Sequence, residues 1–201
     1  MTWNVPSATR PIILVPGWLD NEDTLVPLAN ALRRAGFAVE SCSPQPSDGR
    51  APLEELAAHL AKFVAGRFGR EQEIDFVGFS MGGLIGRVFL QQMGGWRQIR
   101  SFVTLATPHR GTYTAYVTSR PAMLQMRPGS EFLTRLNQDL ARLGAVHFTS
   151  IWTPFDLTIV PPWSSRLPVG RAACVQSPAH AWLPRDPRVQ RAVTSALLGA
   201  S

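Results

Sequence analysis

Short apolar runs alternate with amphipathic segments along most of the chain. The runs are rich in β-branched residues, which is typical of buried strands, and they lie at 12–15, 37–42, 74–79, 99–106, 146–152 and 171–177. Between them, apolar residues recur at helical spacing. This spacing predicts helices around 25–32, after Pro52, at 81–93, at 130–143 and after Asp186. Such alternation predicts an α/β protein with about six mainly parallel strands and helices on both faces of the sheet.

The stretch from 107 to 145 is the one long excursion between predicted strands. Its helix at 130–143, with Ser130 as N-cap, carries apolar residues at core-like spacing. A helix buried in this way is poorly suited to swing open, so only 112–128 is left to form a short flap. We therefore expect a small or absent lid on a single domain spanning residues 1–201.

The charge pattern argues against nucleic-acid binding. The chain has a net charge of +6, and nineteen of its twenty basic residues are arginines scattered along the sequence rather than gathered in a run. No apolar stretch approaches the roughly 18 residues that a membrane span needs, so we expect no transmembrane segment. The first residues also lack the apolar middle of a secretory signal, which favours a cytoplasmic location.

The two cysteines are expected to remain free thiols. Cys42 falls on the second predicted strand and Cys174 on the last, near opposite edges of such a sheet. About five strand spacings of roughly 4.8 Å would separate them, whereas a disulfide tolerates at most about 7 Å between Cα atoms. No cysteine and histidine cluster has zinc-ligand spacing.

The segment GFSMGG at 78–83 fits the pattern G-x-S-x-G between a predicted strand and a predicted helix. A sharp turn there lifts the hydroxyl of Ser80 above the carboxyl edge of the sheet. Gly78 and Gly82 avoid clashes with the neighbouring strand and helix, and Gly83 lets the helix lie close to the sheet. The pattern predicts that Ser80 is a nucleophile rather than only a turn residue.

A serine nucleophile needs a base, and the base needs an orienting acid. In this architecture the acid and then the histidine follow the serine in the chain, each just after a strand. Asp156 follows the fifth predicted strand and His180 follows the sixth. We expect these two residues to complete a triad with Ser80.

An oxyanion hole requires two backbone donors. One is expected from the amide of Met81, directly after the nucleophile. The other is expected in the loop VPGWLD after the first strand, where the main chain of Trp18 is the first choice and Leu19 is the alternative.

The chain resembles the α/β-hydrolase superfamily, and within it the bacterial triacylglycerol lipases and esterases. The resemblance rests on GFSMGG, LVPGW at 14–18, LATPHRGT at 105–112 and RPGSEFLTRLN at 127–137, although Pro16 stands where many relatives have histidine. It implies a minimal α/β-hydrolase fold and hydrolysis of carboxylic esters through a serine acyl-enzyme, without metal or organic cofactor. His109 and Arg110 are expected to be structural, with Arg110 paired to Asp20 or Asp23.

Apolar residues in the loops at the carboxyl edge of the predicted sheet indicate a small-molecule ester or lipid substrate. The predicted substrate contacts are Leu19, Tyr113, Leu157, Ile159, Val160 and Trp182. Two other functions stay open from the sequence. An acyltransferase could use the same triad with an alcohol in place of water, and a non-catalytic binding protein could be built on the same scaffold.

Overall fold

A six-stranded parallel sheet forms the centre of the computed structural model, which describes residues 10–199. The strands are β1 (Ile12–Val15), β2 (Val39–Ser41), β3 (Ile74–Phe79), β4 (Ile99–Leu105), β5 (His147–Trp152) and β6 (Arg171–Cys174). Their order across the sheet is β2-β1-β3-β4-β5-β6, and each neighbouring pair is parallel. All six predicted strands are confirmed, although β2 and β6 are shorter than expected.

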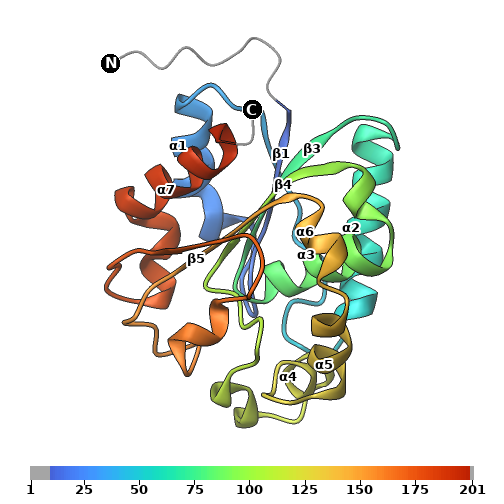
Figure 1. Cartoon of the computed structure of the whole chain (residues 1–201), viewed down its shortest axis with the longest axis vertical. Coiled ribbons are helices and arrows are strands. Elements are labelled where there is room, and N and C mark those ends of the chain that lie inside the picture. Colours follow the sequence, from blue (N-terminus) through green and yellow to red (C-terminus); the bar gives the residue numbers. More distant parts are fainter. Residues whose placement is uncertain (1–9, 200–201) are drawn as a thin grey trace.

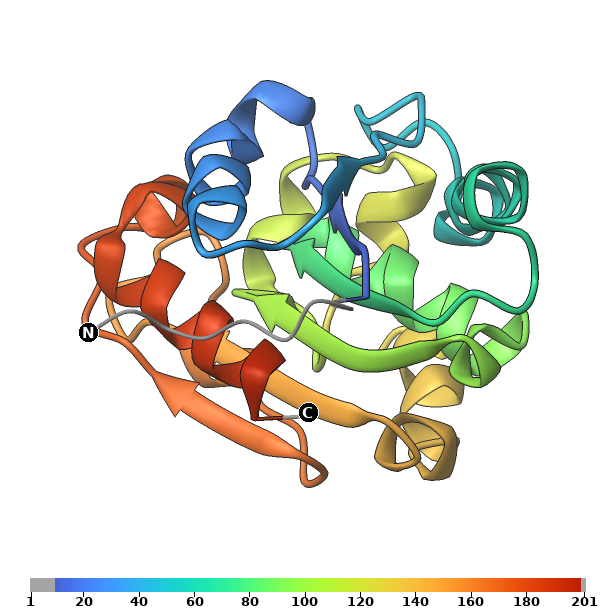
Figure 2. The same cartoon turned by 90° about the horizontal axis from the view of Figure 1, so that it is seen from above.

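Helices cover both faces of this sheet (Figures 1 and 2). α1 (Val26–Arg34) and α7 (Pro187–Leu198) pack on one face, and α2 (Leu53–Phe68) and α3 (Met81–Gln92) on the other. Shorter helices are α4 (Pro121–Gln125), α5 (Glu131–Gln138), α6 (Ala141–Gly144) and the 3₁₀ turns at Glu22–Leu25, Gly95–Arg97, Tyr113–Val117, Pro162–Ser165 and His180–Arg185. Among the described residues, no helix has both the length and the apolar run required to cross a membrane.

The alternation of strand side chains divides the interior into two cores. Ile13 and Phe76 point into the core under α2 and α3, whereas Ile12 and Val77 point into the core under α1 and α7. β1 and β3 are buried on both faces, which explains why their sequences are apolar except at Asp75. Because all six strands are parallel, their carboxyl ends meet at one edge of the sheet.

The predicted helix at 130–143 is instead two helices, and this prediction was wrong. Ser130 caps the start as expected, because its hydroxyl accepts from the Leu133 amide. However, α5 ends at Gln138, where side chains from α3 take its last carbonyl groups. Gln91 donates to the carbonyls of Leu136 and Asp139, so these groups are satisfied without a continuous helix.

The segment 112–128 is fastened to the rest of the molecule. Met123 and Met126, which we expected in a flap, are buried in the core under α2 and α3. The Thr112 amide donates to the Met126 carbonyl, and the Tyr113 amide donates to the Val160 carbonyl. The apolar side chains left exposed in this segment are Tyr113, Tyr116 and Val117 in one turn, and Leu124 in α4, which agrees with a small lid at most.

Cys42 and Cys174 are both free thiols, as predicted. Cys42 follows β2 and Cys174 ends β6, and these strands are the opposite edges of the sheet (blue and orange in Figure 2). Cys42 is buried and Cys174 is exposed. Burial, and to a lesser degree the nearby Glu22 carboxylate, raises the pKa of the Cys42 thiol to about 12.

This difference predicts that only one thiol reacts quickly with Ellman's reagent in the native protein. At pH 8 a thiol with a pKa of about 12 is ionised in roughly one molecule in 10⁴, and the thiolate is the reactive form. We expect Cys174→Ser to remove the fast reaction and denaturant to expose Cys42. Two fast-reacting thiols in the native protein would contradict the burial of Cys42.

Candidate active site

Ser80 occupies a strained turn between β3 and α3. Its backbone has φ 52° and ψ −123°, a region that non-glycine residues rarely adopt. The turn is held by two hydrogen bonds: the Ser80 amide donates to the Leu105 carbonyl at 2.8 Å, and the Gly83 amide donates to the Ser80 carbonyl at 3.1 Å. The strained turn predicted from GFSMGG is therefore present.

Each glycine of this motif faces a close neighbour. A Cβ on Gly78 would lie 2.6 Å from the Cα of Gly83, and a Cβ on Gly82 would lie 2.3 Å from the Val15 carbonyl oxygen. A Cβ on Gly83 would lie 2.0 Å from the Thr107 hydroxyl. These distances explain why the start of α3 can approach the ends of β1 and β4 only with glycine.

Asp156 and His180 are brought together beside this turn. The Asp156 Oδ2 lies 2.8 Å from the His180 Nδ1, and the carboxylate is almost fully buried. Its other oxygen accepts hydrogen bonds from the amides of Thr158 and Ile159, both at 2.8 Å. The ring of Phe79, the residue just before Ser80, packs against the imidazole at 4.8 Å between centroids.

Other carboxylates near these elements are engaged elsewhere. Asp186 caps α7 and pairs with Arg188 at 2.7 Å, and Asp139 lies 3.6 Å from Arg142. Within the described residues no hydrogen bond joins Ser80 to His180. Catalytic hydrogen bonds are often long in unliganded enzymes and shorten when substrate binds, so this geometry is compatible with a serine and histidine pair.

The predicted oxyanion loop lies against the nucleophile. A Cβ on Gly17 would be 2.9 Å from the Cβ of Ser80. The Leu19 amide donates to the Ser47 carbonyl at 3.0 Å, so it is not available as a second donor, which favours Trp18. Met81 is the first residue of α3, where an amide has no acceptor within its own helix.

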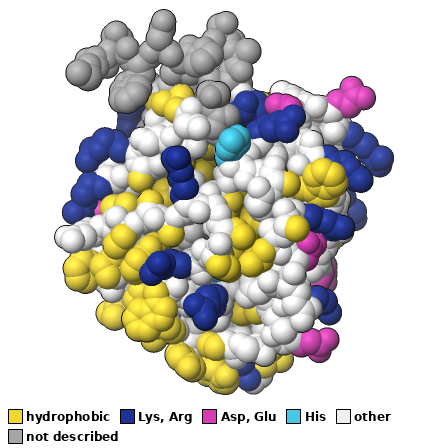
Figure 3. Space-filling view, viewed as in Figure 1, with side chains coloured by type: hydrophobic (Ala, Val, Ile, Leu, Met, Phe, Trp, Pro, Cys, Tyr) yellow, Lys and Arg dark blue, Asp and Glu magenta, His cyan; other side chains and the backbone are white. Residues whose placement is uncertain are grey.

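The predicted substrate contacts have different environments. Leu19, Tyr113, Leu157 and Trp182 are exposed, and Val160 is half-buried. Ile159 is different: it is buried in the core under α1 and α7, because its amide binds Asp156 and turns its side chain inward. We expected Ile159 to lie in a loop at the carboxyl edge of the sheet with its side chain open to substrate, and that placement was wrong. Figure 3 shows exposed apolar side chains gathered over the lower left of this face, with arginine or lysine side chains among them.

His109 and Arg110 are adjacent in the sequence but have different surroundings. His109 is fully buried and hydrogen-bonded to the Thr104 hydroxyl at 3.0 Å, which supports a structural role. Burial, together with the nearby guanidinium of Arg87, holds the pKa of His109 well below its usual range. The expected ion pair of Arg110 with Asp20 or Asp23 is absent from the described residues, and Asp20 accepts from the Thr24 hydroxyl instead.

One buried charge was not anticipated from the sequence. Arg87 has no exposed surface, although it lies in the apolar run of α3. It donates to the side chains of Gln91 and Asn137, each at 2.9 Å, and to the Leu136 carbonyl at 3.0 Å. An arginine within LIGRVFL was the available signal, but two of its partners, Leu136 and Asn137, lie about fifty residues further along the chain.

The parallel sheet, the strained serine turn and the loop order define an α/β-hydrolase, as the resemblance in the sequence implied. Residues 11–153 match the model of the palmitoyl protein thioesterase family, and the chain belongs to that family. The match includes Ser80 and the loop after β1 but ends before Asp156 and His180. Among curated proteins, no sequence matches the chain significantly.

Solved structures share this fold at low sequence identity. The mature lipase BlEst2 of Bacillus licheniformis has a TM-score of 0.79 and 16% identity, over 98% of this chain and 95% of that one. Lipase B of Aspergillus fumigatus gives 0.76 and 18%, over 94% and 52%. A gene product of Listeria innocua gives 0.68 and 15%, over 94% of each chain. Family and fold together support a hydrolase of esters or thioesters.

The packing around the turn predicts that Gly82→Ala destabilises the protein. The new Cβ would meet the backbone oxygens of Val15 and Pro16 at 2.3 and 2.4 Å, and backbone cannot easily move away. We expect a loss of about 1–3 kcal/mol in the free energy of unfolding, measured by denaturant titration.

Gly66→Ala is the matched control. Gly66 lies inside α2, and a Cβ there meets no atom within 4 Å. This substitution should stabilise the protein by roughly 0.5–1 kcal/mol, because alanine is the better helix former. Equal stability of the Gly82→Ala variant and the native protein would refute the close approach of α3 to β1.

Proposed function

We propose that this protein hydrolyses carboxylic esters or thioesters through a covalent acyl-enzyme, with Ser80 as nucleophile, His180 as base and Asp156 as orienting acid. The proposal rests above all on one observation, the 2.8 Å contact between a buried carboxylate and His180 beside the strained turn of Ser80. A buried, hydrogen-bonded carboxylate fixes both the ring orientation and the tautomer of a histidine.

In the proposed reaction, the Ser80 Oγ attacks the substrate carbonyl carbon while His180 Nε2 takes the hydroxyl proton. Asp156 accepts the Nδ1 proton and stabilises the imidazolium that forms. The amides of Trp18 and Met81 donate to the oxyanion of the tetrahedral intermediate. His180 then gives its proton to the departing alcohol or thiol. Water attacks the acyl-enzyme by the same route and releases the carboxylic acid and Ser80.

The surroundings of the site favour an apolar acyl group. Leu19, Tyr113, Leu157 and Trp182 are at least half exposed and lie in loops that follow β1, β4, β5 and β6. Burying such side chains against a hydrocarbon chain is favourable by about 25 cal/mol per Å² of apolar surface. The family's name adds long-chain thioesters to the ester substrates indicated by the sequence, and the similar structures include lipases.

The first test is Ser80→Ala on matched p-nitrophenyl esters and acyl thioesters of graded chain length. We expect turnover to fall by a factor on the order of 10⁶, because the nucleophile is lost. A fluorophosphonate should label native protein at Ser80 and leave the variant unlabelled. Native-like turnover by a folded Ser80→Ala protein would rule out the acyl-enzyme. Ester products formed in the presence of added alcohol would show that the enzyme is an acyltransferase.

The second test separates the acid from other carboxylates. In Asp156→Asn, the amides of Thr158 and Ile159 hold the remaining oxygen, so the new NH₂ group faces His180 Nδ1. The proton then moves to Nε2, which cannot accept from Ser80. Turnover should fall by a factor on the order of 10⁴. Asp139→Asn is the control and should keep native turnover. The reverse pattern would mean that Asp156 is not the acid.

A further inference from the structure

The segment 157–160 carries the two amides that hold the candidate acid, yet it belongs to no helix or strand. The amides of Thr158 and Ile159 each donate to Asp156 Oδ1 at 2.8 Å. Ile159 is anchored by its side chain, which is buried in the core under α1 and α7. Thr158 is exposed and Val160 is half-buried, so the backbone on either side of Ile159 depends on hydrogen bonds from elsewhere in the chain.

Thr112, in the loop after β4, supplies these hydrogen bonds. Its hydroxyl accepts from the Val160 amide at 2.8 Å and donates to the Thr158 carbonyl at 2.9 Å. The Tyr113 amide donates to the Val160 carbonyl at 2.8 Å, and the Thr114 hydroxyl donates to the Thr158 carbonyl at 2.6 Å. A single hydroxyl, which can donate one hydrogen bond and accept two, thus holds both ends of the segment.

Thr112 is itself held from its other side. It is buried, and its amide donates to the Met126 carbonyl at 2.9 Å. Met126 lies in the core under α2 and α3. The preceding residue, Gly111, has φ 89°, and a Cβ there would lie 2.5 Å from the backbone nitrogen of Pro128. The hydroxyl of Thr112 is therefore presented from a backbone that is fastened to the core.

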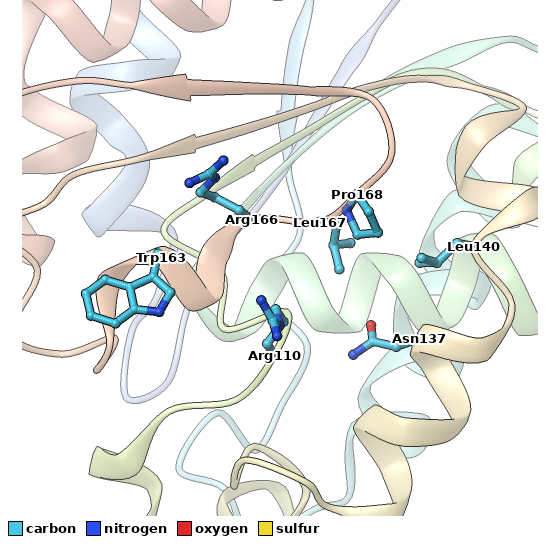
Figure 4. Close-up of a pocket in the computed structure, with 7 residues that line it drawn as sticks. All are labelled: Arg110, Asn137, Leu140, Trp163, Arg166, Leu167 and Pro168. Atoms are coloured by element: carbon cyan, nitrogen blue, oxygen red, sulfur yellow. The ribbon is translucent and has the colours of Figure 1, made fainter.

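The strand order explains why the two loops meet. β4 and β5 are parallel neighbours, so the loops that follow them leave the same edge of the sheet side by side. A second contact joins them, because the Arg110 amide donates to the Ser164 carbonyl at 3.0 Å. Arg110 and Trp163 line one cavity of about 550 Å³, and Figure 4 shows them in the two adjoining segments. Thr112 is thus part of an extended junction between these loops.

We propose that Thr112 is a positioning residue of the candidate triad. Its hydroxyl fixes the segment 157–160, the amides of this segment fix the Asp156 carboxylate, and the carboxylate fixes the orientation and tautomer of His180. The proposal rests on the proposed function, in which His180 accepts the proton of Ser80. It gives a role to the last residue of the LATPHRGT segment.

The first readout is turnover of p-nitrophenyl esters by Thr112→Val, which keeps the branched shape of the side chain but has no hydroxyl. We expect kcat to fall by a factor on the order of 10–10², because small displacements of a catalytic group have effects of that size. KM should change little. Thr112→Ser keeps the hydroxyl and should return kcat to within about threefold of the native value.

The second readout is the tautomer of His180, which can be measured without hydrolysis. Nitrogen-15 NMR of histidine-labelled protein shows which ring nitrogen carries the proton at about pH 9, where imidazole is neutral. The His180 signals are assigned by their loss in His180→Gln. In the native protein the proton should be on Nδ1, which faces Asp156. We expect a mixture of tautomers in Thr112→Val and the native tautomer in Thr112→Ser.

Thr194→Val is the matched control. Thr194 lies in α7, and its hydroxyl donates to the Gln190 carbonyl of the same helix at 2.9 Å. Loss of this hydroxyl should change neither kcat nor the His180 tautomer. Circular dichroism verifies that each variant is folded. If Thr112→Val does not fold, Thr112→Cys replaces it, because a thiol is a weaker donor and acceptor, and smaller changes in the same two readouts are expected.

The two readouts distinguish this proposal from the proposed function. If the native protein cleaves neither esters nor thioesters, the proposed function fails, and the His180 tautomer alone decides whether Thr112 positions Asp156. Native kcat and native tautomer in folded Thr112→Val would overturn the proposal. So would a fall in kcat with the native tautomer, or a change confined to KM, since Thr112 would then act through the neighbouring Tyr113 rather than through Asp156.

Discussion

The close approach of the start of α3 to the ends of β1, β3 and β4 is the constraint on which the site depends. At Gly78, Gly82 and Gly83 an added Cβ would lie between 2.0 and 2.6 Å from its nearest neighbour. The same approach puts Gly17 against the Cβ of Ser80. If the helix moved outward to admit side chains, the loop after β1 and the serine would separate, and the two predicted backbone donors could not reach a common atom.

Backbone strain is concentrated at this same edge of the sheet. Among the described residues, the non-glycine residues with positive φ are Leu19, Ser80 and Ala106, which follow the adjacent strands β1, β3 and β4. Such conformations cost roughly 1–3 kcal/mol each and persist only where the surroundings enforce them. Two buried cores on a fully parallel sheet supply that enforcement, because strands packed on both faces cannot relax toward an unstrained turn.

Sequence reasoning succeeded where the determinants are local. Apolar runs located all six strands, and G-x-S-x-G located the strained turn, because both depend on residues within one turn or strand. The chain order of Asp156 and His180 anticipated their 2.8 Å contact. The break between α5 and α6 was missed because Gln91, about 45 residues earlier, binds the carbonyls there. Ile159 was misplaced although the contact that orients it is local, since its amide donates a hydrogen bond to Asp156 three residues earlier and its side chain lies in the core under α1 and α7.

The two faces of the molecule bury charges of opposite sign. On the side of α1 and α7, the buried carboxylate of Asp156 accepts hydrogen bonds from two backbone amides and lies against the imidazole of His180, so groups next to it stabilise its charge. On the side of α3 and α5, the buried guanidinium of Arg87 has only neutral partners. Many other arginines form ion pairs with surface carboxylates, so the net charge of +6 is not spread evenly. The buried guanidinium of Arg87 therefore has no neutralising carboxylate among the described residues, whereas the buried carboxylate of Asp156 lies against hydrogen-bond donors.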